Sequence, residues 1–146
     1  MSNIQRLLDM IAAWGRQDID AVMTFIHDDI QWNNTGGFRA PVTGKAAMRE
    51  ALEQMASTIA ESRWRLFDYM EEGDKLWMEG ADEFILKDGK RVAIPYMGML
   101  EYQDGVILRW REYYNGYLHT TQQKDGVVGE HAEIMLDRPV ITGPKA

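Results

Sequence analysis

The chain has 146 residues, of which 45% are hydrophobic and 27% are charged, a balance typical of a soluble globular domain with a sizeable core. Its formal net charge of −7 argues against a surface that binds nucleic acid or anionic membranes, because such surfaces need clustered Lys and Arg. The chain lacks cysteine, which excludes thiol nucleophiles, disulfides and cysteine-ligated metals. It has neither a signal-peptide pattern nor a run of about 20 apolar residues, so we expect no membrane span and a cytoplasmic protein.

The first part of the chain predicts three helices and one short strand. Apolar residues at helical spacing predict helices over 3–14, 18–26 and 45–61. Between the second and third helices, the sequence HDDIQWNN (27–34) favours a short strand with mixed faces. The following TGGFRAPVTG (35–44) is rich in glycine and contains proline, so it predicts a loop.

The middle of the chain predicts an antiparallel series of strands. Residues 63–70 and 75–86 have the composition of strands and are separated by a Glu-Glu-Gly-Asp turn. The segment 91–115 predicts two long strands joined at Asp104-Gly105, because this hairpin turn needs the positive φ that Asp and Gly tolerate. Helices followed by strands predict an α+β fold, with the helices packed on one face of the sheet.

The last segment, 120–146, is polar and contains several glycines and prolines. Residues 130–136 favour one or two helical turns, and the rest predicts an extended tail. This tail could cover a neighbouring subunit or the mouth of a pocket, or it could be disordered. We therefore expect one domain over 1–119 and a C-terminal extension over 120–146.

Strand periodicity places two carboxylates on faces that also carry aromatic residues. Trp110, Glu112 and Tyr114 share one face of the last strand, and Asp82 and Phe84 share one face of the strand over 75–86. Hairpin pairing brings these strands together through the segment that carries Ile94, Tyr96 and Gly98. If the faces coincide, they form one concave surface, which Asn33 could join from the early strand.

Two carboxyl groups in one apolar pocket cannot both ionise at low cost. Desolvation and mutual repulsion raise a pKa, which leaves an acid and a base side by side near neutral pH. Such a pair can activate water, protonate a leaving oxygen or move a proton between carbons without a metal or an organic cofactor. The amide of Asn33 could hold a water molecule, and Tyr96 could donate to a developing oxyanion.

Other readings of the same residues remain open. Glu112 could form a surface ion pair with an arginine of its own strand, and Asp82 with Lys75 or Arg91. His27 and His119 are isolated, so they do not indicate a metal site. The glycine-rich nucleotide motifs and the serine-hydrolase motif do not occur.

Three segments resemble a known family. The run GMLEYQDGVILRWREYYN (98–115) resembles the final hairpin of limonene-1,2-epoxide hydrolase-like proteins, a branch of the NTF2-like (SnoaL-like, ketosteroid isomerase-like) superfamily. HDDIQWNN resembles the early strand of that family, which carries a pocket Tyr and Asn two residues apart. EGADEF (79–84) resembles its Glu-Arg-x-Asp segment. Over about 3–119, the resemblance implies a cone-shaped fold in which a strongly curved sheet wraps around three N-terminal helices, with a deep apolar pocket and usually a dimer.

The resemblance also implies roles for individual residues. The acid of the family corresponds to Asp82, the water-activating base to Glu112, and the water-holding Asn and Tyr to Asn33 and Gln31. The arginine that bridges the two carboxylates corresponds to Gly80, which is the main departure. The residues expected to contact the substrate are Gln31, Trp32, Phe84, Ile94, Tyr96, Trp110 and Tyr114.

The first functional hypothesis is a cofactor-independent acid–base enzyme that hydrates an epoxide in a hydrophobic small molecule. The alternatives are an isomerase, cyclase or lyase acting on a terpenoid, polyketide or aryl substrate, or a non-catalytic binding protein with the same pocket. Trp77, Met97, Met99 and Tyr113 share the opposite face of the sheet. That surplus apolar surface predicts a homodimer.

Overall fold

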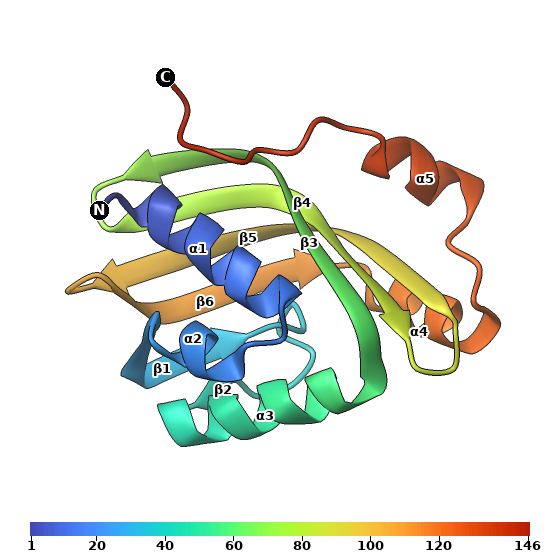
Figure 1. The fold of residues 1–146 in the computed structure, drawn as a ribbon, viewed down its shortest axis with the longest axis horizontal. Helices are drawn as coiled ribbons and strands as arrows, with labels where there is room; N and C mark the ends of the chain where they lie inside the picture. The colour runs from blue at the N-terminus through green and yellow to red at the C-terminus, as the bar shows by residue number, and fades with distance from the viewer.

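A computed structural model describes all 146 residues as five helices and one six-stranded sheet, which confirms the α+β prediction. The sheet has the order β2-β1-β6-β5-β4-β3, and it is curved and unclosed (Figure 1). Every neighbouring pair is antiparallel except β1 and β6, which are parallel. The helices are α1 (Asn3–Gly15), α2 (Ile19–Met23), α3 (Lys45–Thr58), α4 (Gly116–Asp125) and α5 (Glu130–Leu136). The strands are β1 (Ile26–Asn33), β2 (Val42–Thr43), β3 (Ile59–Glu72), β4 (Lys75–Leu86), β5 (Arg91–Gln103) and β6 (Val106–Tyr114).

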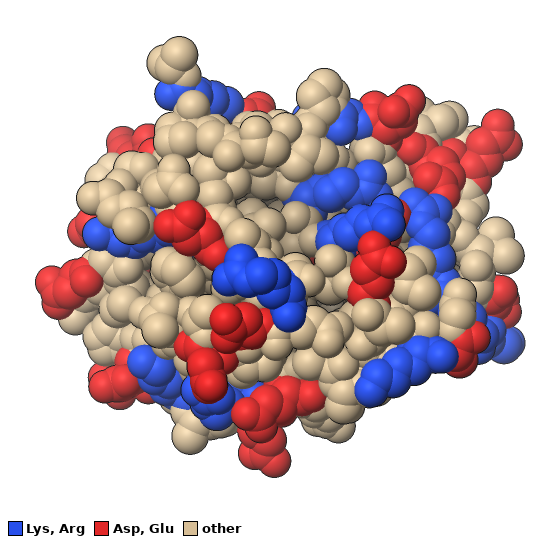
Figure 2. Space-filling view, viewed as in Figure 1, with Lys and Arg blue, Asp and Glu red and all other residues tan.

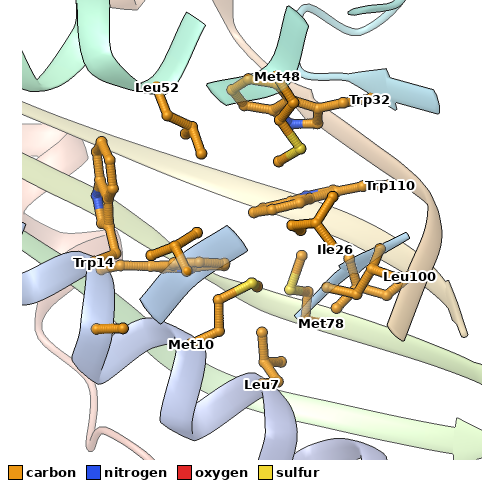
Figure 3. Packing of buried hydrophobic residues seen from close by; sticks show 14 of the residues in the cluster. Leu7, Met10, Trp14, Ile26, Trp32, Met48, Leu52, Met78, Leu100 and Trp110 are labelled. Atoms are coloured by element: carbon orange, nitrogen blue, oxygen red, sulfur yellow. The ribbon is translucent and has the colours of Figure 1, made fainter. Parts of the chain in front are cut away.

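The three N-terminal helices pack on one side of the sheet, as predicted (Figure 1). Helix α1 begins at an N-cap, where the hydroxyl of Ser2 accepts a hydrogen bond from the backbone N–H of Gln5. Its apolar side chains enter the main core, in which Met48 of α3 lies against the ring of Trp32 and next to Trp110 (Figure 3). The helices therefore close one side of the concave face of the sheet.

The long hairpins follow the predicted turns. Asp104 and Gly105 both have positive φ, 51° and 81°, as the tight turn between β5 and β6 requires. The register shifts by one residue at Glu101/Tyr102, and beyond this shift Gly98 pairs with Glu112 and Tyr96 with Tyr114. In the preceding hairpin, Asp82 pairs with Ile94. The predicted faces of β4, β5 and β6 therefore meet on the concave side.

Two element boundaries differ from the prediction because strand pairing takes over where helices were expected. Helix α2 ends at Met23, and β1 already begins at Ile26, where it pairs with Ile107 of β6. Helix α3 ends at Thr58, and Ile59 begins β3 by pairing with Leu86 of β4. Tertiary pairing therefore shortens both helices.

The C-terminal segment folds back on the domain. The turns predicted over 130–136 form α5, but helix α4 was not predicted, and it spans the expected boundary between 119 and 120. Helix α5 packs on the outer face of the sheet, where Ala132 and Leu136 join a small apolar cluster with Phe67. The last residues run along β3, with the N–H of Ile141 donating to the carbonyl oxygen of Leu66 (Figure 1).

Ion pairs help to hold this segment in place. Arg91 pairs with Glu133 of α5, and Nη1 of Arg65 donates to the carbonyl oxygen of Leu136 at 3.3 Å. Acidic and basic side chains are interspersed on the face shown in Figure 2, and several basic ones gather beside α5. None of the helices combines the length and the apolar composition needed to cross a membrane.

Candidate active site

The concave face of the sheet borders a cavity of about 850 Å³, which we call the central hollow. Of its 24 lining residues 14 are hydrophobic, so a bound molecule would contact mostly apolar surface. Four of the five tryptophans line it: Trp14, Trp32, Trp64 and Trp110. The rings of Trp64 and Trp110 are stacked, with centroids 5.3 Å apart and an interplanar angle of 16°. Trp14, Trp32 and Trp110 extend from different elements around this part of the molecule (Figure 3).

Asp82 borders the central hollow, as its strand parity predicted. Its carboxylate has no hydrogen-bond partner within the protein, and burial raises its pKa from 3.8 to about 7. The group therefore changes charge close to neutral pH. This is the behaviour expected of a carboxyl that acts as an acid or a base.

Glu112 lies in the wall of the same hollow and is 6% exposed. Burial raises its pKa well above the usual range, the charge of Asp82 adds to this effect, and a hydrogen bond from Trp110 opposes it. In that bond, Nε1 of Trp110 donates to Oε1 of Glu112 at 3.0 Å. Gly98 leaves room for the side chain, because a Cβ atom there would lie 3.2 Å from Cγ of Glu112. The two carboxyl groups thus form an electrostatically coupled pair.

The surface ion pairs considered from the sequence do not form at these two carboxylates. Nε of Arg91 donates to Glu83 at 2.9 Å, so Arg91 serves the neighbouring carboxylate on the outer face of β4. Arg109 and Arg111 both pair with Glu101, at 3.1 and 3.2 Å. None of these arginines therefore pairs with Asp82 or Glu112, and Arg39, which lines the hollow, forms no ion pair with either carboxyl.

Gly80 and Tyr96 explain why no cation stands between the carboxylates. The two residues pair across β4 and β5, and a Cβ atom at position 80 would lie only 2.0 Å from the carbonyl oxygen of Arg65 and 2.6 Å from Oη of Tyr96. The hydroxyl of Tyr96 accepts from Nε1 of Trp64 at 2.5 Å and donates to the carbonyl oxygen of Arg65 at 3.4 Å. Tyr96 does not line the hollow, so its placement differs from the predicted substrate contact.

The inward face of β1 differs from the prediction by one residue. Gln31 is exposed, and Asn33 is absent from the lining of the hollow, although its Oδ1 atom is buried without a hydrogen-bond partner. Trp32 and Asn34 line the hollow instead. The expected placement of Gln31 and Asn33 in the pocket is therefore wrong.

The remaining predicted contacts lie where the strand pattern placed them. Trp32, Phe84, Ile94, Trp110 and Tyr114 all line the hollow.

Helix α4 adds residues to the hollow that the sequence analysis did not identify. Tyr117, His119, Thr120 and Gln123 line it, with Phe38 opposite them in the loop after β1. The signal that could have revealed this helix is its N-cap, at which Oδ1 of Asn115 accepts from two backbone N–H groups. No group of three or more His, Cys, Asp or Glu residues is arranged to hold a metal ion.

The comparisons with known proteins agree with this architecture. A family model described as a SnoaL-like domain matches residues 7–110. The chain belongs to the SnoaL-like family. The predicted superfamily is thereby confirmed.

Solved structures share the SnoaL-like fold at low sequence identity. An LEH-like epoxide hydrolase from M. tuberculosis is 22% identical with a TM-score of 0.74, over 86% of this chain and 92% of that one. TerC, co-crystallized with polyporic acid, is 19% identical with a TM-score of 0.74, over 84% and 98%. An NTF2-like protein of unknown function from Burkholderia pseudomallei is 17% identical with a TM-score of 0.69, over 80% and 94%. No curated protein matches the chain. At such identities, the likeness shows only the fold of the SnoaL-like chain. Its reaction must be inferred from the residues of the site.

Proposed function

We propose that this SnoaL-like protein is a cofactor-independent acid–base enzyme acting on a hydrophobic, oxygenated small molecule. The first candidate reaction is the addition of water to an epoxide. The observation that carries the proposal is the pair of Asp82 and Glu112, which borders one aromatic hollow and forms no ion pair with an arginine or lysine. Placing such a pair among tryptophans destabilises the ionised forms, and an acid–base reaction would use the resulting pKa values.

The environments of the two carboxyls favour different roles. Only Glu112 accepts a hydrogen bond from the protein, and this bond favours its ionised form. We assign Glu112 as the base that removes a proton from water and Asp82 as the acid, as the resemblance implies. Because burial and the charge of Asp82 raise the pKa of Glu112, this base is active in the state in which the proton of the pair lies on Asp82. The water oxygen forms a bond to an epoxide carbon, the carbon–oxygen bond of the ring breaks, and Asp82 gives its proton to the leaving oxygen. The amide of Asn34, at the edge of the hollow, could hold the water.

The test is turnover of terpene and aryl epoxides in ¹⁸O-labelled water. We expect a singly labelled diol from the wild type. Glu112→Gln and Asp82→Asn should each lower kcat about 100-fold or more, the usual contribution of a general acid or base. Glu101→Gln is the matched control, because this carboxylate lies on the outer face and pairs with Arg109 and Arg111. Full turnover by Glu112→Gln would refute the assignment.

A second candidate is an isomerase, cyclase or lyase that uses the same pair. It is favoured by Gly80, because the space for a bridging cation is filled by Tyr96 and the backbone of Arg65. A pair without a cation suits the movement of a proton between carbon atoms, in which one carboxyl removes a proton and the other supplies one. Conversion of an enolisable ketone to an isomer of the same composition, with no oxygen atom added from water, would support this reaction over hydration. Asp82→Asn should lose this conversion.

A further inference from the structure

His119 is the polar side chain of α4 that lies between two aromatic residues of the site. It lines the central hollow, and its ring centroid is 6.1 Å from that of Phe84 and 6.0 Å from that of Tyr114. Neither ring nitrogen takes part in a hydrogen bond within the protein. Burial lowers its pKa, so the imidazole is neutral near pH 7 and offers one donor and one acceptor. The mechanism proposed above does not use this group.

The two aromatic neighbours locate His119 relative to the carboxyl pair. Phe84 follows Asp82 by two residues on β4, and Tyr114 follows Glu112 by two residues on β6. Successive side chains on one face of a strand are about 7 Å apart. His119 therefore lies against Phe84 and Tyr114, the side chains that follow the carboxyl pair on the same faces of β4 and β6. The two aromatic rings separate the imidazole from the carboxyl pair.

Helix α4 holds His119 in a fixed position. Asn115 caps the helix, and the fully buried Gln122 ties the second turn of the helix to the free edge of β5. Oε1 of Gln122 accepts from the N–H of Ala93 at 2.7 Å, while Nε2 donates to the carbonyl oxygens of Ala93 at 3.0 Å and Val128 at 3.2 Å. Because β6 ends at Tyr114, no residue of β6 pairs with Ala93. The side chain of Gln122 makes the hydrogen bonds to Ala93 that a further residue of β6 would make. The imidazole is therefore presented by an anchored element.

We propose that His119 is a specificity-determining residue that hydrogen-bonds a second oxygen of the bound molecule, separated by Phe84 and Tyr114 from the oxygen engaged by the carboxyl pair. This inference rests on the proposed function, since both polar positions would contact one substrate. The stacked rings of Trp64 and Trp110 in the wall suit a flat molecule. The substrate class is thus a flat aryl compound with oxygen functions at both ends.

Equilibrium binding of two matched probes tests this inference. The probes are 2,6-dihydroxynaphthalene and 2-naphthol, which differ by one hydroxyl at the far end of a flat ring system. By calorimetry, we expect wild-type protein to bind the diol about tenfold more tightly, which corresponds to about 1.4 kcal/mol. His119→Phe keeps a ring against Phe84 and Tyr114 but should remove the preference. His119→Gln, which keeps a donor and an acceptor, should restore part of it, and exposed His131→Phe should retain it fully.

Equal dissociation constants of the wild type for the two probes would overturn the inference, as would a preference that survives in His119→Phe. The binding readout is independent of turnover. The Asp82→Asn variant should keep the sensitivity of diol binding to position 119 even where it forms no product. Failure of the acid–base proposal and failure of the His119 proposal therefore give different results.

Discussion

Replacing Asp82 by Asn should stabilise the fold in a way that depends on pH. Burial raises the pKa of Asp82 from 3.8 to about 7, so the folded state holds this proton more tightly than the unfolded chain. The stability contributed by the proton is fully present below a pH of about 4 and is lost as the pH rises to about 7. Asn is uncharged throughout. The free energy of unfolding of the variant relative to wild type should therefore increase by about 1.4 kcal/mol per pH unit across this window.

The assay is urea unfolding, followed by tryptophan fluorescence, at pH 5, 7 and 9. From pH 5 to pH 9, the advantage of Asp82→Asn should grow by about 3 kcal/mol or more. The two pH units below pH 7 supply this amount at Asp82 itself, and the variant also removes the charge that raises the pKa of Glu112, which acts in the same direction. Any constant effect of exchanging a carboxyl for an amide cancels in this difference. Asp29→Asn, which removes an exposed carboxylate, is the control for the change in net charge. A difference between Asp82→Asn and wild type that stays the same from pH 5 to pH 9 would refute the reasoning.

Three further changes test the architecture around the site. Gly80→Ala should lower the free energy of unfolding by about 2 kcal/mol or more, since the added Cβ would meet the carbonyl oxygen of Arg65 at 2.0 Å; an unchanged urea midpoint would contradict this. Gln122→Leu leaves the N–H and the carbonyl of Ala93 without partners, so it should lower the free energy of unfolding by about 3 kcal/mol and speed amide hydrogen exchange in α4. Wild-type protection of the α4 amides in this variant would show that the helix needs no anchor. Met97 is 58% exposed on the outer face of β5. If this face forms the expected homodimer, light scattering should show a dimer for the wild type and a monomer for Met97→Asp, and a wild-type monomer at micromolar concentration would count against the dimer.

The sequence predicts the carboxyl pair well because local rules determine the strands that carry it. The Asp104-Gly105 turn joins β5 to β6 directly, so these two strands pair. Their register shifts by one residue at Glu101/Tyr102, and beyond it alternation assigns Glu112 to the same concave face as Trp110 and Tyr114. The turn between β4 and β5 does the same for Asp82. Each of these inferences spans fewer than about 30 residues and needs no knowledge of distant packing.

The face of β1 could not be predicted in this way, because no turn connects it to its partner. β1 pairs in parallel with β6, which lies more than 70 residues further along the chain, so the packing of Trp32 against Trp110 selects its inward face. A shift of one residue moves every side chain to the other face. The prediction that Gln31 and Asn33 face the pocket therefore selected the opposite face of β1.

Helix α4 was not predicted because its buried face is polar. Gln122 is the buried residue of this helix, and it is held by hydrogen bonds to β5 rather than by apolar contact. Hydrophobic periodicity, the main signal for an amphipathic helix, is accordingly absent. The end signals are present, with Asn115 at the N-cap and Gly126 in the left-handed conformation at the C-terminus.

The pairing of Gly80 with Tyr96 bears most directly on the type of chemistry. Because the Tyr96 hydroxyl and the backbone of Arg65 occupy the space above Gly80, a long cationic side chain at this position would have to displace the edge of β3. Packing therefore excludes a bridging cation at position 80, and because neither carboxyl forms an ion pair, we expect the pair to hold a proton near neutral pH. A reaction that needs an acid and a base together fits such a pair. A reaction that needs two carboxylates would require a cation beside them, supplied by the substrate or by a movement of Arg39, which lines the hollow.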